Sequence, residues 1–304
     1  MFDRVLLLTD LGDAPELTYG PVAAIAEVCN SKVIVFHAVR GSSDLYYLEG
    51  DAAKVRDLID EQAEAKVRPQ LEGVADALEA MGVNTGVVTR IGSTFDVALR
   101  AIEQLDIDLV VIPQENYADF TTRIGGSTTA RIIRETDVPV LTINEAFRSQ
   151  SDTWRGFSKI ITPVGFAPGG LDGLPAAESF AAEFGSSLEL VHVVNPLHQQ
   201  VLDTPEGEIL LPKDMYYKIR SRLESKLSNA AHSISQAPSY WRLLEDNKPG
   251  SGVMSYADRA SADLIVVPPV SRSGVRTTLL GSVAEHVIKN ARCPVLTLHS
   301  GSLE

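Results

Sequence analysis

Short apolar runs alternate along the chain with longer stretches in which apolar residues recur at helical spacing. In the first half, runs rich in Val, Ile and Leu are typical of buried strands at 4–9, 32–39, 84–91, 108–113 and 138–144. Helical spacing occupies 17–29, 51–82, 95–105 and 128–135 between them. Strands separated by such helices require right-handed crossovers and a parallel sheet covered on both faces. The pattern therefore predicts a five-stranded parallel α/β sheet.

The second half repeats the landmarks of the first at a constant distance of 155 residues. The matching pairs are 108–113 with 263–268, 126–127 with 281–282, 138–143 with 293–298, and 37–39 with 192–194. The corresponding strands are expected at 159–163, 188–194, 240–245, 263–268 and 294–299. One register kept over four segments is not a chance similarity, so we predict two copies of one fold. The domains are 1–146 and 157–304, joined by a polar linker at 147–156 and packed as a pseudo-symmetric pair.

Composition and charge narrow the class of protein. The formal net charge of −13 disfavours a nucleic-acid partner and an anionic membrane surface. The longest apolar runs, such as 264–269, are too short to span a bilayer, and the N-terminus lacks the layout of a secretory signal. Two cysteines without a CxxC pair indicate neither a disulfide framework nor a zinc site. We expect a cytoplasmic protein without a metal.

A ligand of an open parallel sheet is expected beyond the carboxyl ends of strands one and four. In both halves a Gly-Ser pair precedes the helix after strand four, at Gly126-Ser127 and Gly281-Ser282. Exposed N–H groups and the positive helix end make this a candidate anion or phosphate site. The alternative is that each pair only caps its helix, with Ser127 and Ser282 as the caps.

Three segments carry a resemblance to a known family. They are the Asp-Leu-Ile-Val-Val run at 263–267, the stretch 272–285 that ends in Leu-Leu-Gly-Ser-Val-Ala-Glu, and Cys-Pro-Val-Leu-Thr at 293–297. Together they resemble a universal stress protein domain, and because both halves show them in order, the whole chain resembles a tandem universal stress protein. The resemblance implies an adenine-nucleotide alpha-hydrolase-like fold and a role in the stress response.

Family members that bind ATP have the motif G-x2-G-x9-G-[ST] after strand four and an Asp that ends strand one. Carried over to this sequence, the nucleotide-binding positions are Asp10, Ala38, Pro113, Asn116, Gly126, Ser127 and Thr128 in the first half. In the second half they are Val193, Pro268, Ser271, Gly281 and Ser282, with Gly165 in place of the strand-one acid.

Both halves depart from this motif at its first two glycines. Pro113 and Pro268 lack an N–H donor, and Asn116 and Ser271 cannot match the backbone freedom of glycine. The resemblance therefore implies degenerate nucleotide loops, and we expect no cofactor, with ATP binding as the alternative. Asp10 favours the first half for residual binding, whereas the phosphate-pairing arginines of the stretch 272–276 favour the second.

The function expected from the residues and the resemblance is a stress response carried out by binding and association. We assign no catalytic residue, because no nucleophile motif accompanies the repeated His37 and His192, which we expect to be packed at strand ends. Two alternatives remain: an ATP-binding and slowly hydrolysing member of the family, and a carrier of a small apolar ligand in the second half, where an insertion occupies 195–208. The resemblance further implies that the terminal strands pair between the domains, and a homodimer is a further alternative.

Overall fold

The computed structural model describes residues 1–12, 16–40, 51–114, 128–195, 201–204, 207–210, 213–267 and 281–299. The chain separates into two compact units, with the division at Gly156–Phe157.

The first unit is a five-stranded parallel sheet between two layers of helices. Its strands are β1 (Arg4–Leu8), β2 (Lys32–Val39), β3 (Asn84–Ile91), β4 (Leu109–Gln114) and β5 (Val140–Asn144), in the order β5-β4-β1-β2-β3. Its main helices are α1 (Glu16–Cys29), α2 (Asp51–Glu79), α3 (Thr94–Gln104) and α4 (Thr128–Glu135). Right-handed crossovers in this strand order place α1 and α2 on one face and α3 and α4 on the other. The contacts of α1 with α2 and of α3 with α4 agree.

The second unit repeats this architecture element by element. Its strands are β6 (Lys159–Pro163), β7 (Ser187–Val194), β10 (Ser239–Glu245), β11 (Leu264–Val267) and β12 (Val295–Thr297), in the parallel order β10-β7-β6-β11-β12. The helices are α6 (Leu174–Glu183), α7 (Lys213–Ser233), α8 (Pro249–Ala260) and α9 (Ser282–Asn290). The predicted fold, two copies of a doubly covered parallel sheet, is confirmed.

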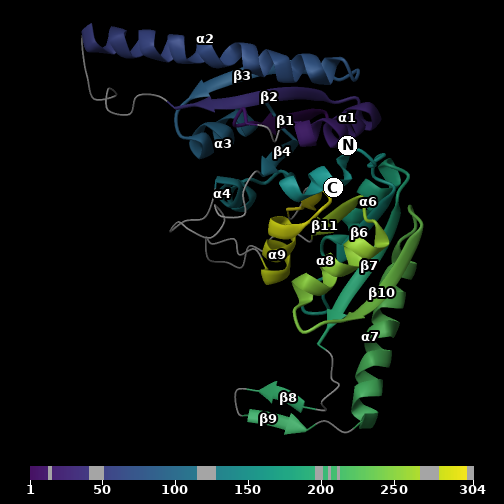
Figure 1. Cartoon of the computed structure of the whole chain (residues 1–304). Helices are drawn as coiled ribbons and strands as arrows, with labels where there is room; N and C mark the ends of the chain where they lie inside the picture. The colour runs from purple at the N-terminus through teal and green to yellow at the C-terminus, as the bar shows by residue number, and fades with distance from the viewer. Residues whose placement is uncertain are drawn as a thin grey trace. The chain divides into compact units, whose positions relative to one another are not determined.

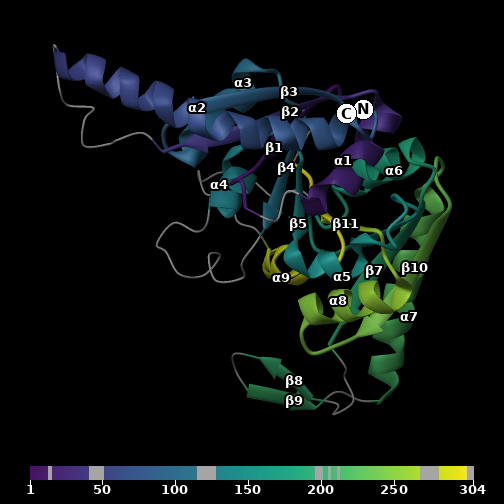
Figure 2. The ribbon, with the colours of Figure 1, turned by 45° about the horizontal axis from the view of Figure 1, so that its top comes forward.

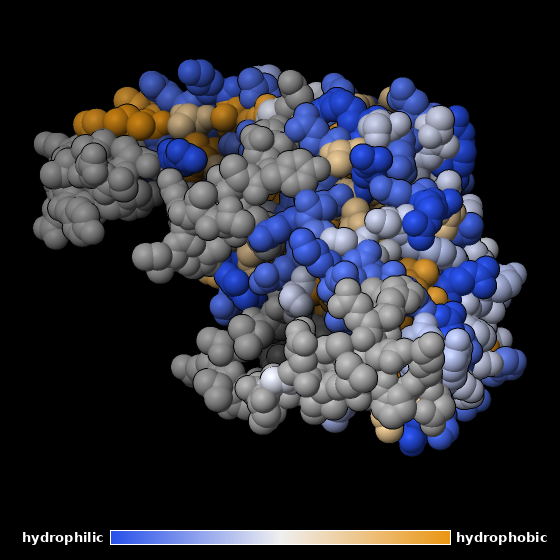
Figure 3. Space-filling view, turned by 60° about the horizontal axis from the view of Figure 1, so that its bottom comes forward, coloured by the Kyte–Doolittle hydropathy of each residue, from blue (hydrophilic) through white to orange (hydrophobic). Residues whose placement is uncertain are grey.

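Helix α2 is longer than the sheet that it covers. It lies alongside β2 and β3 and continues past their ends (Figures 1 and 2). The part over the sheet buries Leu71 and Leu78 completely, whereas Val55 and Leu58 in the projecting part are 52% and 53% exposed. Figure 3 shows the resulting apolar strip in orange at its upper left. Helical periodicity alone does not distinguish these two parts, because both carry apolar residues at the same spacing.

Two short elements lie outside the predicted pattern. The insertion after β7 forms an antiparallel hairpin of β8 (Val201–Thr204) and β9 (Gly207–Leu210), drawn apart from the main sheet in Figure 1. Residues 147–156, expected to be a polar linker, contain the helix α5 (Arg148–Ser151) and pack against α1 as part of the first unit. Phe147 is buried there and its ring meets Trp154 edge-on at 6.1 Å. The Trp154 ring also lies against Gly20 of α1, so aromatic packing holds this stretch in the first unit although its overall composition is polar.

The aspartate that precedes strand four anchors strand one in both units. Asp108 accepts hydrogen bonds from the N–H groups of Asp3 and Arg4, at 2.9 and 3.0 Å on its two different oxygens. Asp263 accepts both bonds, from Ser158 and Lys159, on one oxygen at 3.1 and 2.8 Å. Burial raises the pKa of both carboxyls despite these bonds.

This difference predicts unequal costs for the same substitution. In Asp108→Asn one oxygen becomes an NH₂ group, which faces an N–H donor, so we expect a loss of about 1 kcal/mol of unfolding free energy. In Asp263→Asn the remaining oxygen can still accept both bonds, and the loss should be less than half as large. Urea denaturation of the two variants measures both values, and equal losses would contradict the prediction.

Candidate functional site

In the first unit, a tight turn after β1 presents the carboxylate of Asp10 to solvent. The N–H of Thr9 donates to the carbonyl of Phe36 at 3.0 Å, which extends the hydrogen bonding between β1 and β2 by one residue. Leu11 then adopts a left-handed conformation with a φ of 67°. The N–H of Gly12 donates to Oδ1 of Asp10 at 3.1 Å. The turn therefore places an exposed carboxylate at the strand end where the sequence predicted a ligand contact.

The other described positions of the first site lie at the same edge of the sheet. Ala38 is buried near the end of β2, opposite Arg90. Pro113 lies in β4 opposite Ile143, and Thr128 begins α4 with its side chain exposed. Asn116, Gly126 and Ser127 lie outside the described residues. Since β1, β2 and β4 are adjacent parallel strands, the structure brings Asp10, Ala38 and Pro113 to one edge.

In the second unit, the loop after β6 folds back on itself where the first unit has Asp10. The N–H of Gly165 donates to the carbonyl of Gly170 at 3.0 Å, and a Cβ on Gly170 would lie 2.6 Å from the backbone of Gly165. The close approach therefore requires glycine at 170, and Gly165 offers no carboxylate at the position of Asp10. Val193 is half-buried and packs beside Gly252. Pro268 and Ser271 lie outside the described residues.

The predicted serine cap of α9 is wrong. Gly281 occupies the N-cap position with φ −63° and ψ 150°, and Ser282 is the first helical residue. The carbonyl of Gly281 accepts the hydrogen bond from the N–H of Glu285 at 3.0 Å. The helix therefore begins one residue earlier than it would with Ser282 as the cap. The N-cap has no side chain that could bond the first N–H groups, and both Gly281 and Ser282 are exposed. The equivalent Ser127 lies outside the described residues.

The two repeated histidines have the same structural partner. Nδ1 of His37 lies 2.7 Å from the carbonyl oxygen of Thr9, and Nδ1 of His192 lies 2.8 Å from that of Val164. A carbonyl oxygen only accepts, so Nδ1 is the donor in both. Each histidine fastens strand two to the loop after strand one, which is the packed role that we expected for it.

The second unit surrounds its histidine with different chemistry. The ring of Phe166 lies 4.9 Å from that of His192, and the ammonium of Lys226 lies 5.1 Å above Phe166. The corresponding residues of the first unit are Leu11 and the buried Leu71. A cation over an aromatic ring thus stands in the second unit where the first unit has two leucines.

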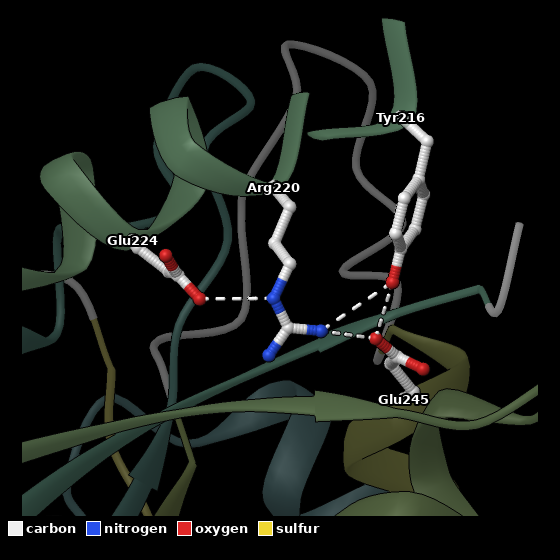
Figure 4. Close-up of polar contacts among 4 residues, drawn as sticks. All are labelled: Tyr216, Arg220, Glu224 and Glu245. Carbon is white, nitrogen blue, oxygen red and sulfur yellow. Dashed lines mark hydrogen bonds and ion pairs between the residues drawn. The ribbon is translucent and has the colours of Figure 1, made fainter. Parts of the chain in front are cut away.

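A polar cluster near the carboxyl end of β10 was not predicted from the sequence. The hydroxyl of Tyr216 donates to Glu245 at 2.7 Å, and Arg220 bonds both Glu245 and, at 3.0 Å through Nε, Glu224 (Figure 4). The spacing 216–220–224 indicates one helix face, but no sequence signal brings Glu245 to it. The cluster joins α7 to the last residue of β10. The corresponding residues of the first unit, Glu61, Ala65, Pro69 and Arg90, cannot form it.

The described residues show neither a redox pair nor a metal site. Cys293 is buried, and burial raises the pKa of its thiol, so its reactive thiolate is disfavoured. No three His, Cys, Asp or Glu side chains among these residues are placed to hold a metal ion. The part of the chain that the structure describes also contains no helix long and apolar enough to cross a membrane.

Comparison with known proteins agrees with both the fold and the repeat. The family model of the universal stress protein family matches residues 1–144 and again 156–299. A universal stress protein of Methanocaldococcus jannaschii is 27% identical over 148 residues, which are 47% of this chain and 82% of that protein. The universal stress protein YxiE of Bacillus subtilis is 26% identical over 150 residues, 46% of this chain and 97% of YxiE. The crystal structure of a universal stress protein from Archaeoglobus fulgidus superposes with a TM-score of 0.70 at 16% identity, covering 98% of each chain.

Proposed function

Because the chain belongs to the universal stress protein family and contains two of its domains, we propose that it acts in the cytoplasmic stress response by binding and association rather than by catalysis. Nucleotide binding is weakened in both units by the loop after strand four, and the second unit is the weaker of the two. ATP is the candidate ligand of the first unit.

The observation that carries this proposal is the contrast between the two loops after strand one. In the first unit the turn at Asp10 exposes a carboxylate that can meet a ribose hydroxyl or a metal-bound phosphate. In the second unit Gly165 is closed against Gly170, and the neighbouring Phe166 packs on His192. Two copies of one fold thus differ after strand one, with an exposed carboxylate in the first unit and a glycine in the second.

Calorimetric titration with ATP and Mg²⁺ tests the proposal. We expect binding no tighter than about 0.1 mM, with low-micromolar binding contradicting the degenerate loops. Asp10→Asn keeps an oxygen for the Gly12 N–H but removes the charge, whereas Asp10→Ala removes both. If the carboxylate contacts the ligand, both variants should weaken binding, by about three- to tenfold for Asp10→Asn. Unchanged binding in both would move the residual site away from the first unit.

A further inference from the structure

An arginine of the first unit that the family motif does not assign to nucleotide binding is stacked on an aromatic ring. The guanidinium carbon of Arg131 lies 3.6 Å from the ring centroid of Phe95. Arg131 is exposed, whereas Phe95 is buried. Building on the function proposed above, we infer that Arg131 binds the phosphate farthest from the ribose, so that the first unit selects nucleotides with two or more phosphates.

Both residues lie in the first turns of helices that begin at the carboxyl edge of the sheet. Phe95 is the second residue of α3, which follows the end of β3, and Arg131 is the fourth residue of α4, which follows β4. The helices α3 and α4 are in contact, and the stack joins their first turns. Arg131 therefore lies one helical turn from Thr128, at the edge where the turn after β1 presents Asp10.

Stacking prepares this guanidinium to bind a phosphate. A ring under one face of the guanidinium holds the planar group in place, while its N–H groups point outward in its own plane. Less side-chain freedom is then lost when two of these N–H groups bind two phosphate oxygens. Within the part of the chain that the structure describes, no carboxylate pairs with Arg131. Its N–H groups can therefore bind an anion without breaking an ion pair.

Arg131 and Asp10 suit opposite ends of one nucleotide. The carboxylate of Asp10 can accept hydrogen bonds from ribose hydroxyls, but without a metal ion it would repel a phosphate. Arginine binds phosphate oxygens with two parallel hydrogen bonds, and Pro113 in the preceding strand offers no N–H for that purpose. The single phosphate of AMP stays beside the ribose, whereas the chain of ADP or ATP extends away from it. A second phosphate is therefore the group that Arg131 would recognise.

The fold itself does not require this stack. At the distance of 155 residues, the second unit has Gly250 in place of Phe95 and His286 in place of Arg131, yet it keeps the same architecture. A Cβ at Gly250 would lie 2.7 Å from the Cβ of His286, so α8 and α9 approach too closely there for an aromatic ring. The stacked arginine and the exposed acid thus occur in the same unit, as expected if both contact one ligand.

Phosphorus NMR titrations with AMP, ADP and ATP test the role of Arg131. They are made without Mg²⁺, because this ion itself binds the phosphates. We expect ADP and ATP to bind about tenfold more tightly than AMP, with the largest shift at the terminal phosphate. In Arg131→Gln, ATP binding should weaken about tenfold, and AMP binding should change by less than about twofold. Equal affinities of the unchanged chain for AMP and ATP, or an undiminished preference for ATP in Arg131→Gln, would overturn the inference.

Two further variants control for loss of charge and for the shape of the guanidinium. Arg100→Gln removes the charge of an exposed arginine of α3 whose Nε donates to the carbonyl of Asp96 at 3.2 Å, and it should keep the preference for ATP. Arg131→Lys keeps the charge but not the planar group, so ATP binding should weaken by about threefold. Equal weakening of ATP binding in Arg100→Gln and Arg131→Gln would show an effect of net charge alone and contradict the inference.

Asp10→Asn separates this inference from the function proposed above. It should weaken the binding of AMP and ATP to a similar extent, because both contain the ribose. If Asp10→Asn weakens ATP binding and Arg131→Gln does not, the role of Arg131 is wrong and the nucleotide site stands. If neither variant changes ATP binding, or if ATP at about 5 mM produces no shift, both proposals are wrong.

Discussion

Phe180→Ala is expected to lower the free energy of unfolding of the second unit by about 3–5 kcal/mol, the usual cost of truncating a buried phenylalanine. Phe180 has no exposed surface. Its ring stacks on Phe184 at 4.3 Å and meets Phe157 edge-on at 5.5 Å. Alanine would remove both contacts and leave a cavity among groups that α6 and the start of the unit hold in place.

Denaturant unfolding followed by Trp241 fluorescence measures this loss, because Trp241 lies in β10 of the second unit. Trp154→Phe provides the background in which Trp241 reports alone. Leu171→Ala is the matched control: this residue precedes α6 but is 37% exposed, so its loss should stay below about 0.5 kcal/mol. A loss below about 1 kcal/mol for Phe180→Ala would contradict the prediction that this aromatic cluster anchors the unit.

The double substitution Pro113→Gly with Asn116→Gly is expected to strengthen ATP binding about tenfold to a hundredfold. Pro113 offers no N–H, and a hydrogen bond to a charged group contributes about 1.5–3 kcal/mol. Glycine at both positions restores the donor and lets the backbone approach the phosphates. Asp10 lies at the same edge of the sheet as Pro113, so the restored loop would face a carboxylate already in place.

Calorimetry of the double variant against the unchanged chain measures the gain. Pro268→Gly with Ser271→Gly is the matched control in the second unit, where Gly165 stands in place of the acid. We expect a smaller gain there. If the ATP affinity of the first unit does not change, the substituted residues of the loop after strand four did not limit binding. The proposal that degenerate loops weaken nucleotide binding is then wrong. Circular dichroism verifies that the glycines leave β4 folded.

The sequence by itself determined the architecture and its duplication. Apolar runs such as 32–39 and 159–163 form strands with the predicted bounds, because strands buried on both faces leave a continuous hydrophobic signal. The constant register of 155 residues predicted that Gly126 and Gly281 occupy equivalent positions and that His37 and His192 share a role. The two histidines do share a partner, the carbonyl that follows strand one. Strands and repeats can be predicted in this way because the residues that define them lie close together along the chain.

Only the tertiary structure decided which side chains from distant segments meet. The polar composition of 147–156 predicts a linker, yet Trp154 packs on Gly20 and forms a cavity with α1. Arg220 meets Glu245, and Lys226 lies over Phe166, across different elements. The helix start at Gly281 likewise depended on backbone angles that a Gly-Ser pair leaves open. The periodicity of apolar residues indicates which face of a helix or strand is buried. Which residues that face contacts depends on how the helices and strands pack together. This packing gives the two repeats their different side-chain contacts.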